Sequence, residues 1–193
     1  MQIALFGGRF DPIHNGHLAI AQEVLRSAPS VDEVWLVPDN HHHWNPTVAS
    51  PKQRLEMLTL VQTDKIKAND IGIQVSHLRD GMTATIDVIR ELQKKTKNTY
   101  IFIAGSDQLP RLSEWTDYKE LTMRLPFLIV PRKGHTLKGN LPDNCFWLTD
   151  KEYEPLEDSA TRVRERLANG QSISDLVPKS VEDYIKKHHL YGA

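Results

Sequence analysis

The sequence predicts an α/β fold with a doubly wound parallel sheet, and three observations support this prediction. Short apolar runs rich in Ile, Val and Leu recur along the chain, which is typical of strands buried on both faces. Segments with helical periodicity lie between these runs, and such connections favour right-handed crossovers between parallel strands. The length of 193 residues suffices for one well-buried domain but is short for two. We therefore expect a single domain over residues 1–193, with residues 150–193 forming a C-terminal helical subregion.

The expected elements alternate through the first two thirds of the chain. Strands are expected at residues 3–6, 33–38, 71–75, 100–105 and 126–131. Helices are expected at residues 16–28, 50–64, 83–96 and 114–124. Ser50 before Pro51 predicts an N-cap followed by proline at the first helical position, and Thr83 or Thr85 is expected to cap the third helix.

The pattern changes after residue 131. A polar loop containing glycine and proline covers residues 132–144, and a short strand is expected at 145–148. Two helices, at 159–170 and 178–190, are expected to complete the chain. The sequence contains no internal repeat and no low-complexity tract.

The overall charge is close to neutral, with 24 Lys and Arg residues against 25 Asp and Glu residues. Such a balance gives no field that would attract nucleic acid or a membrane surface, so we expect a small-molecule partner held by local groups. The N-terminal segment does not resemble a signal peptide, and Cys145 is the only cysteine, which predicts a cytoplasmic location. The sequence leaves the oligomeric state open, a homo-oligomer included.

The segment "GGRFDPIHNGH" at residues 7–17 directly follows the first predicted strand. In open α/β sheets the ligand lies beyond the carboxyl ends of the strands, beside the first one. Gly7 and Gly8 are expected to let the backbone turn sharply there, and Gly16 begins a helix whose free N–H groups favour phosphate. His14 and His17 lie on the same side of that helix, where their rings can donate to phosphate oxygens. The segment therefore predicts an anion-binding site.

The spacing excludes two common phosphate-binding motifs. No Gly-Lys-Ser or Gly-Lys-Thr follows, as a Walker motif would require, and the dinucleotide-binding spacing Gly-x-Gly-x-x-Gly is absent. The "HNGH" at residues 14–17 instead resembles the signature of nucleotidyltransferases with two histidines around a glycine. The alternative interpretation is a tight turn that happens to carry two surface histidines.

Nearly the whole chain resembles the bacterial nicotinate mononucleotide adenylyltransferases, members of the HxGH nucleotidyltransferase superfamily. Beyond residues 7–17, segments similar to the family appear in order: "EVWLVP", "QRLEML", "RDGMTATIDVI", "IAGSDQLPRLSEWTDYKEL", "FLIVPRKG", "SATRVRERL" and "LVPKSVEDYIKKHHLYG". The resemblance implies a Rossmann-like nucleotidyltransferase domain that transfers AMP from ATP, with Mg²⁺, to nicotinate mononucleotide. The products are nicotinate adenine dinucleotide, in NAD biosynthesis, and pyrophosphate.

The same resemblance implies a set of site residues. His14 and His17 would be catalytic and would also bind ATP. Further ATP-binding residues would be Gly7, Gly8, Phe10, Gly16, Gly105, Asp107, Arg132, Ser159, Thr161 and Arg164. The pyridine mononucleotide would be bound by Asp11, Trp44, Thr85, Trp115 and Thr116, with Trp115 stacking on the ring and backbone N–H groups near Thr85 receiving the nicotinate carboxylate. No residue is expected to bind a metal directly.

Several of these residues also have an ordinary structural interpretation. Asp107 could cap a helix, Trp115 could belong to the core, and Arg132 could be solvated at the surface. The segment at 159–164 could be an N-capped surface helix with exposed arginines. A choice between the binding role and the structural role of each residue requires the positions of the side chains in the fold.

Departures from the family pattern concern the acceptor more than the reaction. Family members commonly have an aromatic residue at Ala84 and a Pro-His-Lys run where this chain reads "NHHHWNP" at 40–46. A further departure lies in the segment that would bind the β- and γ-phosphates, where Asp158 and Ala160 replace an apolar residue and a serine of the family pattern. We expect the loop at 40–49 to cover the substrate rather than to hold a metal through His41–His43.

The alternatives left open are therefore of several classes. One is an adenylyltransferase for nicotinamide mononucleotide or for both pyridine acceptors. Phosphopantetheine as acceptor is disfavoured by Trp115 and by the "TATID" segment at residues 83–87. A non-catalytic nucleotide-binding regulator is disfavoured by the intact histidine pair. Hydrolysis of a nucleoside triphosphate would need a positioned water and a base, which the sequence does not identify.

Overall fold

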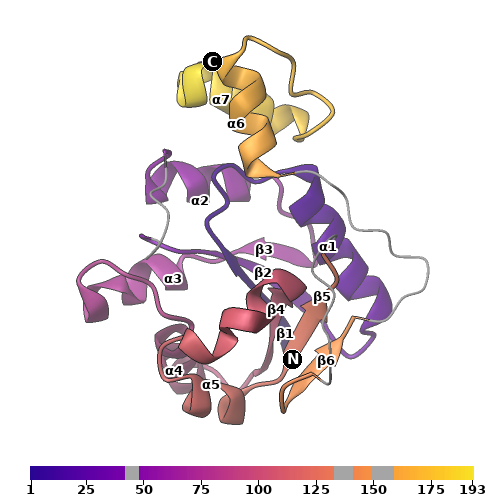
Figure 1. Cartoon of the computed structure of the whole chain (residues 1–193), viewed down its shortest axis with the longest axis vertical. Helices are drawn as coiled ribbons and strands as arrows, with labels where there is room; N and C mark the ends of the chain where they lie inside the picture. Colours follow the sequence, from indigo (N-terminus) through magenta and orange to yellow (C-terminus); the bar gives the residue numbers. More distant parts are fainter. Residues whose placement is uncertain (42–47, 133–140, 149–158) are drawn as a thin grey trace.

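The computed structural model of the chain describes residues 1–41, 48–132, 141–148 and 159–193. Its centre is a six-stranded parallel sheet with the strand order β3-β2-β1-β4-β5-β6 (Figure 1). The order reverses between β1 and β4, so the loops after these two strands border the crevice in which ligands of such sheets lie. The predicted α/β fold with a doubly wound parallel sheet is confirmed.

Five of the six strands that the structure describes lie close to their predicted positions, whereas β3 was not predicted. Their bounds are Gln2–Gly8 for β1, Glu33–Pro38 for β2, Ile66–Ala68 for β3, Thr99–Gly105 for β4, Phe127–Val130 for β5 and Cys145–Trp147 for β6. The strand expected at residues 71–75 is wrong, because α3 covers Ile71–Gln74 and a 3₁₀-helix, η1, follows at Val75–Arg79.

Local contacts explain the helix at 71–74. The side chain of Asn69 accepts a hydrogen bond from the N–H of Ile71 at 3.0 Å, which starts the turn. A Cβ at Gly72 would lie 2.4 Å from the carbonyl oxygen of Pro38, so glycine lets this helix approach the end of β2. Ile71 and Val75 are both buried at a spacing of four residues, which is a helical spacing within an apolar run typical of a strand.

The remaining helices lie close to their predicted positions but are shorter, except η3, which was not predicted. They are α1 at Asn15–Ser27, α2 at Pro51–Thr59, α4 at Thr85–Lys95, η2 at Ser106–Glu114, α5 at Tyr118–Arg124, α6 at Ala160–Ala168, α7 at Lys179–Lys187 and η3 at Leu190–Gly192. The helix expected at 114–124 begins only at Tyr118, because Asp117 before it adopts a positive φ of 50°, outside the helical region.

The capping predictions had different outcomes. Ser50 caps α2 as expected, since its side chain accepts from the N–H of Gln53 at 3.2 Å. The prediction for α4 is wrong, because its N-cap is Ala84, which makes no side-chain cap. The hydroxyl of Thr83 instead donates to the carbonyl of Gly72 at 2.7 Å and accepts from the N–H of Asn40 at 2.8 Å. Thr83 therefore joins the end of β2 to α3.

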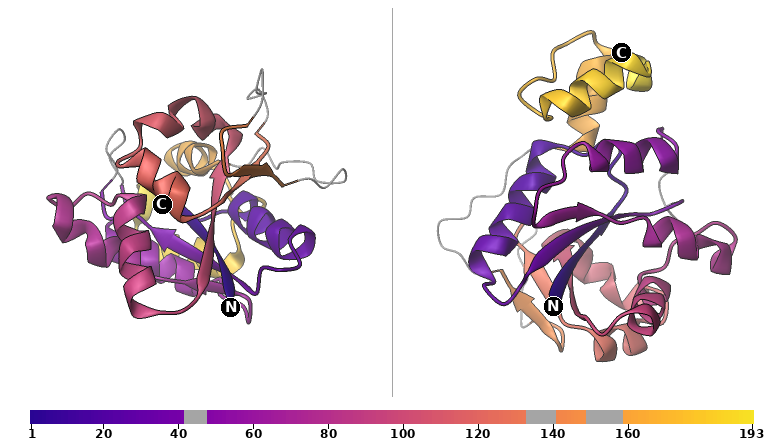
Figure 2. Two further views of the ribbon diagram at one scale, coloured as in Figure 1. Left: turned by 90° about the horizontal axis from the view of Figure 1, so that it is seen from below. Right: turned by 180° about the vertical axis from the view of Figure 1, so that it is seen from behind.

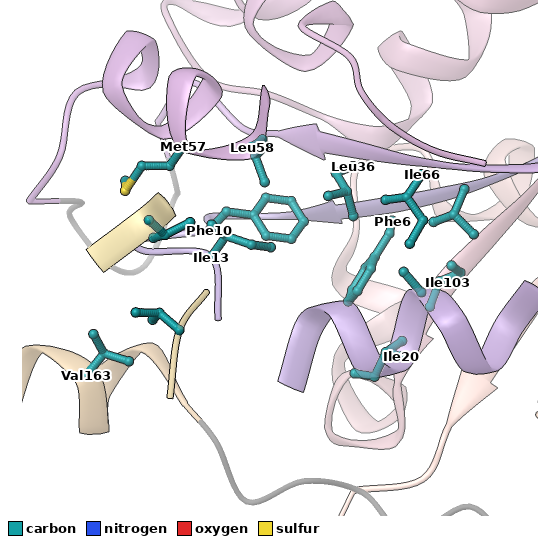
Figure 3. Close-up of a cluster of buried hydrophobic side chains, with 14 of the residues drawn as sticks. Phe6, Phe10, Ile13, Ile20, Leu36, Met57, Leu58, Ile66, Ile103 and Val163 are labelled. Carbon is teal, nitrogen blue, oxygen red and sulfur yellow. The ribbon is translucent and has the colours of Figure 1, made fainter. Parts of the chain in front are cut away.

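Alternate residues of β1 divide the apolar core between the two faces of the sheet. Ala4 and Phe6 belong to a cluster that includes buried residues of α1, α2, α6 and α7, and Figure 3 shows Phe6, Phe10 and Ile13 within it. Ile3 and Leu5 belong to a second cluster, which includes buried residues of α3, α4 and α5. Both faces of the sheet are therefore covered, as its apolar strands predict.

The C-terminal helices α6 and α7 lie together at one end of the molecule, beyond α2 and the start of α1 (Figures 1 and 2). Val163 of α6 and Val181 of α7 are fully buried and belong to the same apolar cluster as Phe10 and Ile13. Burial of this kind contributes roughly 1.5–3 kcal/mol for each large apolar side chain. The C-terminal segment is therefore packed against the loop that follows β1. Within the described part of the chain, no helix is both long and apolar enough to cross a membrane.

Candidate active site

A cavity of about 690 Å³ opens at the carboxyl ends of the central strands. It is lined by residues of β1, β4, α4 and η2 and by the start of α6. The predicted site residues among its lining are Gly7, Gly8, Phe10, Asp11, His14, His17, Thr85, Gly105, Asp107, Trp115, Thr116, Arg132, Ser159, Thr161 and Arg164. Gly16 is buried in the first turn of α1 beside this lining, and Trp44 lies outside the described residues.

Gly7 and Gly8 do not make the expected sharp turn. Both belong to β1 and pair with Val37 and Pro38 of β2, so the chain turns only after them. A Cβ at Gly7 would lie 2.9 Å from the ring of Phe102, whereas one at Gly8 would make only ordinary contacts. Glycine at position 7 therefore makes room for the ring of Phe102 of β4, which lines the cavity.

His14 and His17 stand together at the start of α1. Their ring centroids are 3.7 Å apart and the planes are inclined by 32°. The N–H of His14 donates to Nδ1 of His17 at 3.3 Å, and the ring of Phe10 packs edge-on to the ring of His17 at a centroid distance of 4.9 Å. The sequence prediction that both histidines lie on the same side of the helix start is confirmed.

Both imidazoles are neutral at physiological pH. Burial and the Arg132 guanidinium lower the pKa of His14 to about 3. Burial, the His14 ring and Arg132 lower the pKa of His17 well below 6.5. Because Nδ1 of neutral His17 accepts a hydrogen bond, the ring proton lies on Nε2, which makes that atom a donor. Nδ1 of His14 is buried and has no hydrogen-bond partner among the described residues.

The first backbone amide of α1 is already occupied. The N–H of Asn15 donates to the carbonyl of Leu176 at 2.8 Å, and the N–H of His17 donates to the carbonyl of His14 at 3.0 Å. The free N–H groups expected at the start of this helix therefore do not include those of Asn15 and His17, because the C-terminal segment and the first turn use them. A neutral imidazole N–H can still donate to an anion in this place.

The start of α6 forms another wall of the cavity. Ser159 is the N-cap, and its side chain accepts from the N–H of Arg162 at 3.1 Å. Arg164 donates through Nη2 to the hydroxyl of Thr161 at 3.3 Å and through Nη1 to the carbonyl of Asp11 at 2.6 Å. The helix N-terminus and one guanidinium thus face the same cavity as the histidines, an arrangement that favours anions.

Arg132 and Asp107 form an ion pair at the end of β4. Nε of Arg132 lies 3.3 Å from Oδ1 of Asp107, and the N–H of Arg132 donates to the hydroxyl of Ser106 at 2.8 Å. A Cβ at Gly105 would lie 2.2 Å from Oδ1 of Asp107 and 3.0 Å from Nε of Arg132. Glycine at position 105 therefore allows this ion pair to pack over the strand end.

Another part of the cavity lining contains the aromatic rings of Trp115 and Phe102. The ring of Trp115 is edge-on to Phe102 at a centroid distance of 5.6 Å and lies 6.2 Å from Phe127. Trp115 is only partly buried and lines the cavity, so one part of its surface is available to a ligand. Thr85 begins α4 on the same wall, beside the buried Ala84.

Sequence reasoning missed Arg54 of α2. This side chain is fully buried and donates to Oδ1 of Asp39 at 3.0 Å and to the carbonyls of Arg9, Asp39 and Asn40 at 2.6–2.8 Å. It therefore joins the loop after β1 to the end of β2. The available signal was its position among Met57 and Leu58, at the spacing of the buried face of the helix.

Comparison with known proteins gives consistent matches over the full length. Residues 5–166 match a family described as cytidylyltransferase-like. Two proteins named "Probable nicotinate-nucleotide adenylyltransferase" are similar, one of Oceanobacillus iheyensis at 35% identity over 99% of this chain and 97% of its own length, and one of Shouchella clausii at 37% over the same shares. In structure, a nicotinic acid mononucleotide adenylyltransferase of Plasmodium falciparum complexed with NaAD has a TM-score of 0.82 at 21% identity, covering 98% of this chain and 97% of that chain, which supports the fold.

Proposed function

Because the chain belongs to the nicotinate-nucleotide adenylyltransferases among the cytidylyltransferase-like proteins, we propose that it transfers AMP from ATP to nicotinate mononucleotide. The observation that carries the proposal is the pair of neutral histidines, with ring centroids 3.7 Å apart at the cavity wall and with Arg132 and Arg164 in the same lining. The products are nicotinate adenine dinucleotide and pyrophosphate.

The transfer is a displacement at the α-phosphorus of ATP. The 5′-phosphate oxygen of nicotinate mononucleotide forms the new P–O bond, and the bond from the α-phosphorus to the bridging oxygen breaks, so that pyrophosphate leaves. The attacking phosphate is already an anion at neutral pH, and no protein group has to remove a proton from it. Catalysis then consists of positioning and of stabilising the charge that develops on the phosphates.

His14 and His17 are proposed as the catalytic residues. Nε2–H of His17 is a fixed donor, because Nδ1 of the same ring accepts from the backbone. Phe10 and the His14 ring hold the His17 ring in place through close aromatic contacts. A donor of this kind, directed at the α-phosphate or the leaving group, typically contributes about 100-fold or more to the rate.

ATP is proposed to lie across the phosphate-facing walls. Ser159, Thr161 and Arg164 at the start of α6 suit the β- and γ-phosphates, and Gly7, Gly8 and Gly16 border the place of the α-phosphate. Gly105, Asp107 and Arg132 suit the ribose and the base at the end of β4. Mg²⁺ bound by phosphate oxygens would neutralise part of their charge.

The described residues contain no group of three or more His, Cys, Asp or Glu side chains arranged to hold a metal. We propose that Mg²⁺ arrives with the triphosphate, since Mg²⁺ in such sites is held mainly by substrate phosphates and water.

The pyridine mononucleotide is proposed to lie against Trp115 and Thr116. An electron-poor ring gains from the face of Trp115, and the start of α4 at Thr85 offers N–H groups to a carboxylate. Asp11 is proposed to act here by positioning, because its carboxylate oxygens already accept hydrogen bonds from within the protein. The expected role of Trp44 and the cover formed by residues 40–49 remain predictions, as do the cytoplasmic location and any homo-oligomer.

The experiment that tests the proposal follows both products. With ATP, Mg²⁺ and nicotinate mononucleotide, the protein should form pyrophosphate and nicotinate adenine dinucleotide in equal amounts, and pyrophosphate should not form when the acceptor is omitted. Release of phosphate or pyrophosphate from ATP alone would favour hydrolysis and contradict the transfer. Binding of ATP without formation of any product would favour a non-catalytic nucleotide-binding regulator.

A further inference from the structure

The last residues of the chain contact the loop that carries His14. Tyr191 lies in η3 with its side chain buried in the same apolar cluster as Phe10 and Ile13. Its hydroxyl donates to Oδ1 of Asp11 at 2.7 Å, across 180 residues of sequence. Asp11 precedes His14 by only three positions.

The carboxylate of Asp11 joins three segments of the chain. Asp11 is 2% exposed, and its oxygens accept from the N–H of Val48 at 2.7 Å, from the N–H of Ala49 at 3.0 Å and from Tyr191. Val48 and Ala49 lead into α2, whereas Tyr191 belongs to the C-terminal end. A buried carboxylate is costly without donors, so each of these bonds restrains the position of Asp11.

Further bonds hold the same loop to the C-terminal segment. The carbonyl of Asp11 accepts from Arg164 at 2.6 Å. On the other side of His14, Asn15 donates through its backbone N–H to Leu176 at 2.8 Å and through Nδ2 to the carbonyl of Asp175 at 3.0 Å. Residues 164–191 therefore restrain the loop both before and after His14.

We propose that Tyr191 is a positioning residue for adenylyl transfer, which acts through Asp11 to hold His14 and His17 at the place of the α-phosphate. The inference rests on the proposed function and extends it to a residue outside the cavity. Tyrosine suits the position because the ring fills apolar space while the hydroxyl donates to a carboxylate. Burial and Asp11 raise the pKa of Tyr191, so the hydroxyl stays protonated throughout the working range.

The test is Tyr191→Phe, which removes one hydroxyl and keeps the ring. We expect kcat to fall by about 10-fold while the KM values for ATP and nicotinate mononucleotide change by less than about twofold, because small displacements of catalytic groups affect the transition state most. Turnover is measured well below the melting temperature of each variant. The ring ¹⁵N NMR signals of His14 and His17 should shift in this variant.

Tyr184→Phe is the matched control. Tyr184 of α7 also donates its hydroxyl to a carboxylate, that of Glu56, but this bond does not involve the loop. The control should lose comparable stability, keep kcat within about twofold and leave the histidine signals in place. A folded Tyr191→Phe protein with the same kcat and the same histidine signals as the control would overturn the proposal.

If Tyr191→Phe does not fold, a third variant tests the restraint of the same loop by the C-terminal segment, on which the inference depends. Asn15→Ala removes the exposed bond to Asp175 and leaves the cavity lining unchanged. We expect a smaller loss of kcat, about threefold, with a shift of the histidine signals. Unchanged kcat and signals would then contradict the inference.

If the wild-type protein forms no product, the proposed function fails, and the NMR comparison still shows whether Tyr191 positions the histidines.

Discussion

The two sides of the cavity are held in place by different interactions. The proposed phosphate side, formed by residues 7–17 and 159–164, is fixed by hydrogen bonds between residues far apart in the sequence, donated by the side chains of Arg54, Arg164 and Tyr191. On the proposed pyridine side, formed by Thr85, Phe102, Trp115 and Thr116, the ring of Trp115 is held by contacts with the rings of Phe102 and Phe127. Hydrogen bonds fix direction more strictly than apolar contacts. Substitutions on the phosphate side should therefore affect kcat, and those on the pyridine side should affect KM for the acceptor.

The largest effect is expected for His17→Ala. Loss of a directed Nε2–H donor should lower kcat by at least about 100-fold, while KM for nicotinate mononucleotide changes little. Steady-state release of pyrophosphate measures both values, and circular dichroism checks the fold. Near-normal turnover in a folded variant would contradict the assignment of the phosphate side.

A smaller effect of the opposite kind is expected for Trp115→Ala. Loss of the stacking surface should raise KM for nicotinate mononucleotide by about fivefold, as expected for a contact of about 1 kcal/mol, with kcat nearly unchanged.

Trp35→Phe is the matched control for that experiment. Trp35 of β2 also packs edge-on to an aromatic ring, that of Tyr100, but does not line the cavity. Its replacement should leave KM unchanged. A loss of kcat without a change of KM in Trp115→Ala would remove the distinction between the two sides.

The smallest effect concerns pH. Because the pKa of His14 is about 3 in the folded protein and about 6.5 when unfolded, the unfolded state binds more protons below pH 6.5. The free energy of unfolding should therefore decrease as the pH falls from about 6.5 towards 3, by roughly 1 kcal/mol from His14 at pH 5.5.

Urea unfolding at pH 5.5 and 7.5 measures this dependence. His14→Asn should lose less stability than the wild type between these values, since it lacks the group that titrates. Equal losses in the two proteins would show that His14 is not held neutral by the fold.

The sequence predicts the residues that line the cavity better than the contacts that hold this lining in place. "HNGH" in the segment after the first strand and the alternation of apolar runs with helices place His14 and His17 where the strand order reverses, and the fold confirms that position. These features depend on local spacing.

The prediction of a strand at 71–75 is wrong because a short apolar run fits both a strand and a buried helix. The distinction depends on Asn69 and on the contact of Gly72 with Pro38.

The interactions that hold the lining of the cavity in place depend on contacts between residues far apart in the sequence. No local pattern indicates that Tyr191 meets Asp11, or that Leu176 takes the amide of Asn15, because these pairs form only when the C-terminal segment packs on the loop. Arg54 is intermediate, since its place on the apolar face of α2 is visible in the sequence while its acceptors are not.

The most direct test of the central claim is the preference between two acceptors. The ratio of kcat/KM for nicotinate mononucleotide to that for nicotinamide mononucleotide is measured by pyrophosphate release with ATP and Mg²⁺ at matched subsaturating concentrations. The donors at the start of α4 should favour the carboxylate, which predicts a ratio of about 10 or more. A ratio of one or below would contradict the proposed acceptor site at Thr85 and Trp115.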